Sequence, residues 1–331
     1  MVKPVSVHNE WDPLEEVIVG TAVGARVPSA DRSLLAIEPT LANEASREFP
    51  TYVLEETEQA LEEFVSVLVA SGVRVRRPPP ATTGIYNYCP RDVLLSIGNS
   101  IIEAPMVLRA RADESTAYQE ILNDYMNRGC PWIAAPRRQR PDELYNLEDP
   151  SELALRNIEP AFDAANILRV GQDIVYQVSS SGNLLGAAWL QSVLGPEYRV
   201  DAVEGLYPYA HIDTTISVLR PGLVLVNPSR VTADNLPAVF KGWDVLQCPD
   251  PVDHGTAGWF GSSKWIAMNL FMINPTLAVV DSTQPQLMGL LEANGIDIVP
   301  LNLPYPRLLG GGFHCVTLDV RRAGSLVDYR S

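Results

Sequence analysis

The 331-residue chain lacks long hydrophobic runs and any excess of positive charge. No apolar run approaches the ~20 residues that a membrane-spanning helix needs, and MVKPVSVHNEWDPLEE at the start has no signal-peptide core. The formal net charge of −15 argues against binding to nucleic-acid phosphates or to an anionic membrane. These absences predict a cytoplasmic protein with neither a nucleic-acid nor a membrane partner.

The chain also has few cysteines and none of them are clustered. Cys89, Cys130, Cys248 and Cys315 form no C-x-x-C pair, so neither a disulfide scaffold nor a structural zinc site is expected. No Walker-type lysine follows the glycines at 310–312, and no G-x-G-x-x-G follows a strand. We therefore expect no metal and no other cofactor. Taken singly, each cysteine is best interpreted as a small buried apolar side chain.

What the chain does contain is a loose repeat of one local pattern. Each copy has an Asp or Asn, a β-type run, a turn with Gly or Asn-Pro, and a second β-type run, which predicts a hairpin. The copies are DVLLSIGNSIIEAP, NILRVGQDIVYQ, DTTISVLRPGLVLVNP and NLFMINPTLAVVD, starting at Asp92, Asn166, Asp213 and Asn269. CVTLDVRRAG at Cys315 begins a similar strand, for which WDPLEEVIVG near the N-terminus could be the partner and close a ring. Such repetition favours a radial arrangement with a central funnel, and an ordinary α/β sheet is the alternative.

Helices and loops are predicted between these hairpins. Apolar spacing of three and four residues predicts helices at 54–70, 114–127, 183–194 and 285–294. Two polar, proline-rich stretches, 26–50 and 134–160, are expected to be loops. No Gly/Ser linker or charge block divides the chain, so residues 1–331 are expected to form a single domain.

Ring closure would bring a thiol, an imidazole and several carboxylates into one cavity. A cysteine is a nucleophile only as its thiolate and needs a nearby imidazole or positive charge. Histidine transfers protons near neutral pH, and a carboxylate behind it fixes its orientation. Alone, each residue has a structural interpretation: a core thiol, a structural histidine, an aspartate that caps a turn. Only the combination favours catalysis.

Several segments resemble the arginine-dependent amidinotransferases. The likeness lies in LGGGFHCVTLDVRR, EPAFDAANILR, HIDTT, CPRDVLLSIGNSIIEAPM, SSKWIAMN, NEWDPLEEVIVG and DELYN, and it covers nearly the whole chain. It implies the five-bladed α/β propeller of the guanidine-modifying superfamily, with pseudo-fivefold ββαβ repeats. It also implies transfer of the amidino group of L-arginine to a small-molecule amine acceptor through a covalent amidino-cysteine, with release of L-ornithine. Homodimers are common in this family, which leaves a homodimer open.

The resemblance also implies two sets of site residues. The catalytic set is Asp163, His211 and Cys315. The substrate-binding set comprises two carboxylates for the donor guanidinium and two residues for the donor α-carboxylate: Asp92, Asp213, Arg230 and Ser263. Ser263 is preferred to Ser262 for the last of these roles.

Two departures from the family pattern bear on function. Asn166 stands where the family often has a second acid, so it receives no catalytic role. LYPYA at 206–210 differs from the segment of glycine amidinotransferase, which disfavours glycine as acceptor and favours biosynthesis of a guanidino-containing specialised metabolite. The alternative enzyme is an arginine or agmatine deiminase of the same superfamily, with water as second nucleophile. A non-catalytic binding protein on this fold is the other alternative.

The neighbours of Cys315 receive no catalytic role. Adjacent side chains of a strand point to opposite faces, so His314 is not expected to be the base. The glycines at 310–312 are interpreted as room for substrate. Arg321 and Arg322 are interpreted as structural.

Overall fold

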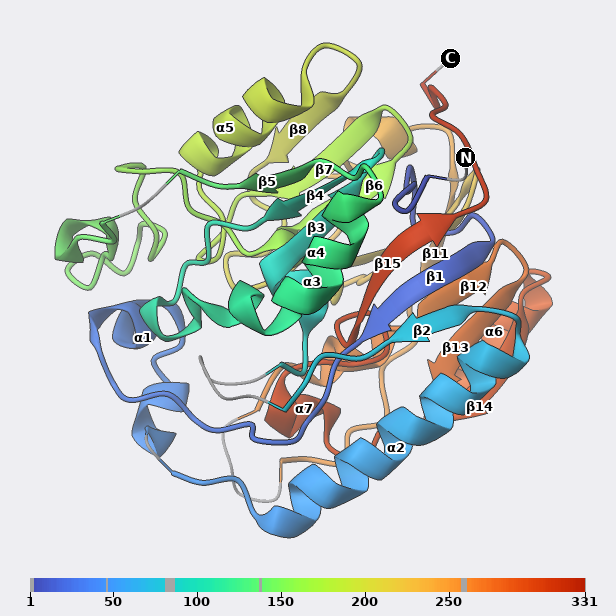
Figure 1. Ribbon diagram of the computed structural model, residues 1–331, viewed down its shortest axis with the longest axis horizontal. Coiled ribbons are helices and arrows are strands. Elements are labelled where there is room, and N and C mark those ends of the chain that lie inside the picture. The colour runs from blue at the N-terminus through green and yellow to red at the C-terminus, as the bar shows by residue number, and fades with distance from the viewer. Residues whose placement is uncertain (1–2, 46, 81–86, 137–138, 257–260, 331) are drawn as a thin grey trace.

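The computed structural model describes residues 3–45, 47–80, 87–136, 139–256 and 261–330. Its named strands form five three-stranded sheets that share one plan. In each sheet the central strand pairs antiparallel with one neighbour and parallel with the other. The five sheets make up a five-bladed α/β propeller (Figure 1), which confirms the predicted fold.

Four of the five sheets are each built from one continuous stretch of chain that begins with a predicted hairpin. They comprise β3 (Leu94–Ile97), β4 (Ser100–Glu103) and β5 (Trp132–Ala134); β6 (Ile167–Val170), β7 (Asp173–Gln177) and β8 (Arg199–Val203); β9 (Ile216–Arg220), β10 (Leu223–Val226) and β11 (Asp244–Gln247); and β12 (Phe271–Asn274), β13 (Leu277–Asp281) and β14 (Asp297–Leu301). All four hairpins expected from the sequence pattern are confirmed.

The fifth sheet closes the ring with strands from the two ends of the chain. β1 (Leu14–Val19) pairs antiparallel with β15 (Thr317–Arg322) and parallel with β2 (Arg74–Arg76). Figure 1 shows β1 between these two partners. The predicted partnership of WDPLEEVIVG with the C-terminal strand is therefore confirmed.

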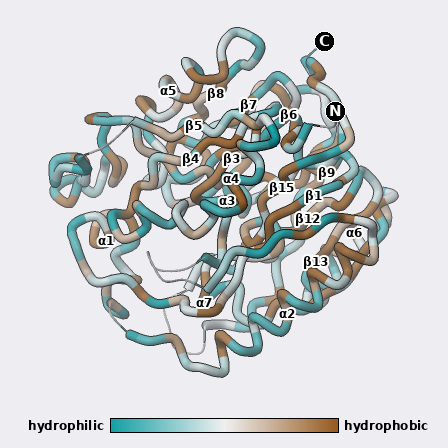
Figure 2. Tube along the Cα trace, viewed as in Figure 1, coloured by the Kyte–Doolittle hydropathy of each residue, from teal (hydrophilic) through white to brown (hydrophobic). Residues whose placement is uncertain are grey.

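Helices join the second and third strands of four of the sheets. They are α2 (Thr51–Ala70), α4 (Gln119–Asn127), α5 (Leu184–Leu194) and α6 (Pro285–Ala293), close to the predicted ranges. α2 buries Val53, Ala60, Leu61, Phe64 and Leu68, and its charged residues are exposed apart from the half-buried Glu58. Figure 2 shows the corresponding alternation of hydrophobic and hydrophilic colour along it. Between β10 and β11 the described helical structure is the short 3-10 helix η6 (Ala238–Phe240).

The two predicted loops contain short helices, which the sequence patterns did not indicate. The first holds α1 (Arg32–Ile37) and η1 (Leu41–Glu44), and the second holds η4 (Asp142–Leu144). Asp31 caps the N-terminus of α1, and its side chain accepts a hydrogen bond from the N–H of Leu34. Six residues are too few for a helical apolar period to be recognisable. Residues 46 and 137–138 of these stretches lie outside the described ranges.

The remaining short helices lie mainly next to the first strands of the sheets. They are α3 (Pro90–Val93), η2 (Arg109–Arg111), η3 (Glu114–Tyr118), η5 (Ala164–Asn166), η7 (Lys264–Met268) and α7 (Pro306–Leu309). No helix in the described part of the chain is long and apolar enough to cross a membrane.

A buried cluster of charged side chains links the first strands of several sheets. Asp319 on β15 pairs with Arg91, with Arg169 at 3.0 Å and with Arg322 at 2.6 Å. Glu10 joins the cluster through Arg169 at 2.6 Å. These positive neighbours offset burial and hold the pKa of Asp319 well below its ordinary value.

We expect Asp319→Asn to lower the free energy of unfolding by about 3–5 kcal/mol, because it leaves buried Arg322 without its counter-charge and leaves Arg91 and Arg169 with Glu10 alone. Urea unfolding followed by circular dichroism would measure the change. Asp328→Asn is the control, since Asp328 pairs with Arg199 near the surface, where both side chains are more than one-third exposed. A fall in unfolding free energy no larger than that of the control would contradict the role given to the buried cluster.

Candidate active site

Each of the five sheets places one polar residue immediately before its first strand. Asp92 lies in α3 before β3, Asp163 precedes η5 and β6, and Asp213 lies in the turn before β9. Asn269 precedes β12, and Cys315 lies in the turn before β15. Contacts with Cys315 or with His211 link all five, so the predicted convergence of the hairpin starts is confirmed.

These residues adjoin a cavity of about 470 Å³. Its wall includes five of the residues singled out from the sequence: Asp163, His211, Asp213, Ser263 and Cys315, with Ser262 beside them. Other parts of the wall come from residues 26–28, 37–41 and 49 of the first predicted loop, from the 207–211 segment and from residues 307–310. Asp92 and Arg230 lie behind this wall, each in contact with residues that line it.

The sulfur of Cys315 is held by three polar neighbours. Asn269 accepts a hydrogen bond from the Cys315 N–H at 2.8 Å and donates one from its Nδ2 to Sγ at 3.2 Å. Sγ lies 3.0 Å from Oδ2 of Asp213, and the Cys89 thiol also hydrogen-bonds to it. That contact with Cys89, together with burial and the charge of Asp213, raises the pKa of Cys315 well above its ordinary value, although His211 opposes the shift.

We expect alkylation of Cys315 by iodoacetamide in the ligand-free protein to be slow at pH 7 and to keep accelerating above pH 9. The reason is that only the thiolate reacts, and the raised pKa keeps the thiol protonated at neutral pH. Peptide mass spectrometry would give the rate at each pH. A rate that is already constant below pH 8 would contradict the raised pKa.

His211 lies between two of the carboxylates. Its Nε2 is 3.2 Å from Oδ2 of Asp163, and its Nδ1 is 3.7 Å from Oδ1 of Asp92. Asp163 is itself held by the backbone N–H of Val107, at 3.1 Å. Burial lowers the pKa of His211, but Asp92, Asp163 and Cys315 outweigh burial and raise that pKa well above its ordinary value. The raised pKa favours the imidazolium form of His211, which can donate a proton.

Asp92 and Asp213 each have one anchored oxygen and one without a donor. Arg111 holds Oδ2 of Asp92 at 2.8 Å, and His314 holds Oδ2 of Asp213 at 3.1 Å. The buried Oδ1 atoms of both have no hydrogen-bond partner among the described residues. Burial raises the pKa of Asp213, but His314, His211 and Cys315 together bring it below its ordinary value. Two carboxylates with unfilled oxygens can accept hydrogen bonds from a guanidinium.

Three of these groups also have the chemistry of metal ligands. The ligand atoms of Asp92, His211 and Cys315 lie within 4.8 Å of one another, and carboxylate, imidazole and thiolate all bind zinc. A metal there would occupy the nucleophilic sulfur and the unfilled carboxylate oxygen. The contacts of these groups are already explained by the thiol, imidazole and carboxylate chemistry, so we assign no metal.

Arg230 and Ser263 form a second polar group. The Arg230 guanidinium donates to Thr214 and Thr215 at 2.9–3.0 Å and to Oγ of Ser263 at 3.2 Å. It lies 3.5 Å from the centre of the Tyr207 ring. Burial lowers its pKa. Among the described contacts, Ser263 is the serine that accepts a hydrogen bond from this arginine, and Ser262 is not.

Two expectations about the neighbours of Cys315 are corrected. His314 was expected to face away from Cys315, but both lie in a turn before β15, and both contact Oδ2 of Asp213. Gly310 lines the cavity, whereas Gly311 and Gly312 are needed for packing. A Cβ on Gly311 would lie 2.7 Å from the Cys89 sulfur, and one on Gly312 would lie 2.7 Å from Cβ of Asn269.

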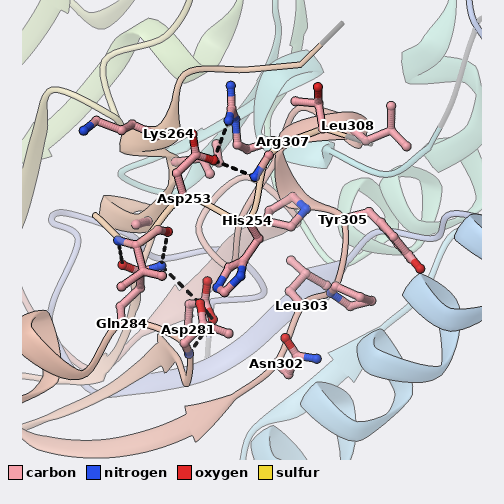
Figure 3. Close-up of a pocket in the computed structure, with 18 of the residues that line it drawn as sticks. Asp253, His254, Lys264, Asp281, Gln284, Asn302, Leu303, Tyr305, Arg307 and Leu308 are labelled. Atoms are coloured by element: carbon pink, nitrogen blue, oxygen red, sulfur yellow. Dashed lines mark hydrogen bonds and ion pairs between the residues drawn. The ribbon is translucent and has the colours of Figure 1, made fainter. Parts of the chain in front are cut away.

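A second cavity, of about 400 Å³, lies beyond a wall made of Ile266, Arg307 and Leu308. Figure 3 shows that its polar groups are largely paired with one another. Asp253 binds Arg307 at 2.5 Å, and Gln284 forms two hydrogen bonds with the backbone of Val252, each at 2.9 Å. The described lining of this second cavity includes no cysteine, whereas Cys315 lines the cavity of about 470 Å³. The larger cavity is therefore the candidate active site.

The sequence interpretation gave no role to several residues that the structure places in or beside the site. Asn269 was recognisable as a hairpin start, but an amide has no catalytic signature of its own. Tyr207 belongs to the unusual LYPYA segment, and Glu38 lies in a stretch expected to be a loop. Arg111 could not be identified because its partner Asp92 is 19 positions away.

No protein-family model matches the chain. It is 51% identical over 98% of its length to an inosamine-phosphate amidinotransferase of Streptomyces glaucescens, of which it covers 99%. It is 38% identical to the mitochondrial glycine amidinotransferase of Gallus gallus, over 98% of this chain and 85% of that protein. The solved structure of an inosamine-phosphate amidinotransferase of Streptomyces griseus superposes with a TM-score of 0.96, at 49% identity and with 100% of both chains covered. The chain therefore belongs to the amidinotransferase family and is a transferase of amidino groups.

Proposed function

We propose that this amidinotransferase uses L-arginine as donor, forms an amidino adduct on Cys315 and releases L-ornithine. The observation that carries the proposal is a cavity lined by Cys315, His211 and Asp213, with Asp92 in contact with His211 behind its wall. Asp92 and Asp213 each keep one buried oxygen without a hydrogen-bond partner among the described residues. A guanidinium is cationic and resonance-stabilised, so it needs both charge pairing and a strong nucleophile. We further propose that residues 1–331 act as one domain.

The donor is bound through its two charged ends. Asp92 and Asp213 accept hydrogen bonds from the guanidinium and hold its central carbon beside the Cys315 sulfur. Arg230 and Ser263 bind the α-carboxylate. The guanidinium also neutralises Asp213, whose charge helps to keep Cys315 protonated, so donor binding favours the thiolate.

In the first step the Cys315 sulfur attacks the guanidinium carbon and the bond from that carbon to the ornithine nitrogen breaks. The His211 imidazolium and the Cys315 thiol together supply the two protons with which the nitrogen leaves as an ammonium. The enzyme is left with neutral His211 and a cationic amidino-cysteine. Asp163 orients His211 and stabilises its charged form.

The second step reverses this sequence with another amine. The acceptor ammonium gives one proton to His211, its nitrogen attacks the amidino carbon, and the carbon–sulfur bond breaks. The second proton returns to Cys315, and the product leaves as a guanidinium. One side chain thus serves as acid in the first step and as base in the second, which gives ping-pong kinetics.

For the acceptor we propose an amine of specialised metabolism, with an inosamine phosphate as first candidate. The basis is the likeness at 51% identity to a relative of that name, compared with 38% for the glycine amidinotransferase. The 207–210 part of LYPYA supplies Tyr207, Tyr209 and Ala210 to the cavity wall, so its difference from the glycine enzyme bears on the substrate. Glycine is the second candidate.

The direct test is to incubate the protein with L-arginine and each candidate amine and to measure ornithine, citrulline and the new guanidine. Ornithine formed in equal amount to the guanidine product supports transfer. Citrulline and ammonia from arginine alone would instead support the deiminase alternative, in which water takes the place of the acceptor.

A further inference from the structure

Glu38 lines the active-site cavity, and its carboxylate has no side-chain partner among the described residues. It follows α1 directly, and its backbone N–H donates to the carbonyl oxygen of Leu34. Its side chain is partly exposed to the cavity. Within the ranges that the structure describes, its carboxylate accepts no hydrogen bond and forms no ion pair.

The ionisable groups around Glu38 come from several elements. Burial raises the pKa of Glu38 to about 7, Asp163 adds to this shift, and His211 opposes it. Tyr207, from the segment between β8 and β9, lines the same cavity, and the charge of Glu38 contributes to its raised pKa. On the side of its own helix, Asp31 caps α1 and Arg32 pairs with Glu148. The cations that line the same cavity are His211, Arg26, Arg111 and Arg307.

Binding of the donor arginine does not require the Glu38 carboxylate. In the proposed function the guanidinium is bound by Asp92 and Asp213, and the α-carboxylate by Arg230 and Ser263. The nitrogen of the acceptor must attack the same carbon that the ornithine nitrogen leaves, so the two nitrogens share one position. The remainder of the acceptor is the part that requires a contact of its own.

We propose that Glu38 is an acceptor-binding residue, whose carboxylate accepts hydrogen bonds from hydroxyl or ammonium groups of a polyhydroxylated amine bound beside His211. This inference rests on the proposed function. A carboxylate offers two oxygens to neighbouring donors, and bonds to an ionised acceptor are stronger than bonds between neutral groups.

The test compares Glu38→Gln with Glu48→Gln, the same change at an exposed residue of the same segment that does not line the cavity. Exchange of labelled ornithine into arginine reports the donor half-reaction without any acceptor. Formation of the guanidine product from an inosamine phosphate reports the acceptor half-reaction. We expect Glu38→Gln to lower kcat/KM for the inosamine phosphate about 10- to 100-fold and to leave the exchange rate within about twofold.

A pH profile separates acceptor binding from a structural effect. Because the pKa of Glu38 is raised to about 7, its carboxylate is ionised above that pH and neutral below it. The advantage of the wild-type protein over Glu38→Gln should therefore be greatest above pH 8 and shrink as the pH falls through 7. Glu48→Gln should follow the wild-type profile throughout.

The possible results lead to different conclusions. Absence of ornithine exchange in the wild-type protein would overturn the proposed function itself. Exchange without turnover of the inosamine phosphate, or unchanged acceptor kinetics in Glu38→Gln, would overturn the inference alone. An equal loss of exchange and acceptor turnover in Glu38→Gln would assign Glu38 to the donor instead and would also overturn it.

Discussion

Replacement of Cys315 by serine should lower the rate of amidino transfer by roughly four orders of magnitude or more. A serine hydroxyl retains a hydrogen-bonding group beside Asp213 and Asn269, so the site should keep its shape. It loses the thiolate, however, and with it the nucleophile for the first step. Rapid-quench kinetics would measure the rate, and intact-mass spectrometry after incubation with arginine would detect the added amidino group in the wild-type protein only.

Cys130→Ser is the matched control for this substitution. Cys130 is also buried, and its thiol donates to the carbonyl oxygens of Asn99 and Pro131, bonds that a serine can keep. It does not line the active-site cavity, so transfer and the amidino adduct should both persist. Substantial turnover in Cys315→Ser, or wild-type protein that stays unmodified at every quench time, would count against the covalent route.

The fold could be predicted from the sequence because its signals are local and repeated. Each hairpin has its own β-type runs and turn, and the same pattern recurs around the ring. The pairing of β1 with β15 is a contact between the ends of the chain, yet it could be anticipated because the repeat left one strand without a partner. The short helix α1 could not be anticipated from the sequence. Its six residues are too few to show a helical spacing of apolar residues, and its start is marked by a single capping residue, Asp31.

The site was predictable to the extent that its residues open the hairpins. Asp92, Asp213 and Cys315 all do so, and the structure places them around His211. The side-chain directions were less predictable. The argument for His314 assumed strand geometry, but the strand begins only at Thr317. Of the three glycines that were interpreted as room for substrate, Gly310 lines the cavity, whereas Gly311 and Gly312 let Cys89 and Asn269 pack close to the nucleophile.

A second large effect is expected for Asp213→Asn. The substitution removes a negative charge that faces both the Cys315 sulfur and the proposed guanidinium position. An asparagine also turns one of the two acceptor oxygens into a donor. We therefore expect kcat/KM for arginine to fall by roughly 100- to 1000-fold, which corresponds to the loss of a buried, charge-assisted pair.

The same substitution should make Cys315 more reactive towards iodoacetamide, although it lowers kcat/KM for arginine. Asp213 is among the groups that raise the pKa of this thiol, so its neutral replacement should lower the pKa and accelerate alkylation by iodoacetamide at pH 8. A protein that had merely lost its fold would alkylate all four of its cysteines, whereas this variant should gain reactivity at Cys315 alone. Asp250→Asn, at a carboxylate paired with Lys264 near the surface, should alter neither measurement. If arginine kinetics and alkylation both stayed at wild-type values in Asp213→Asn, this carboxylate would have no part in holding the donor or in controlling the nucleophile.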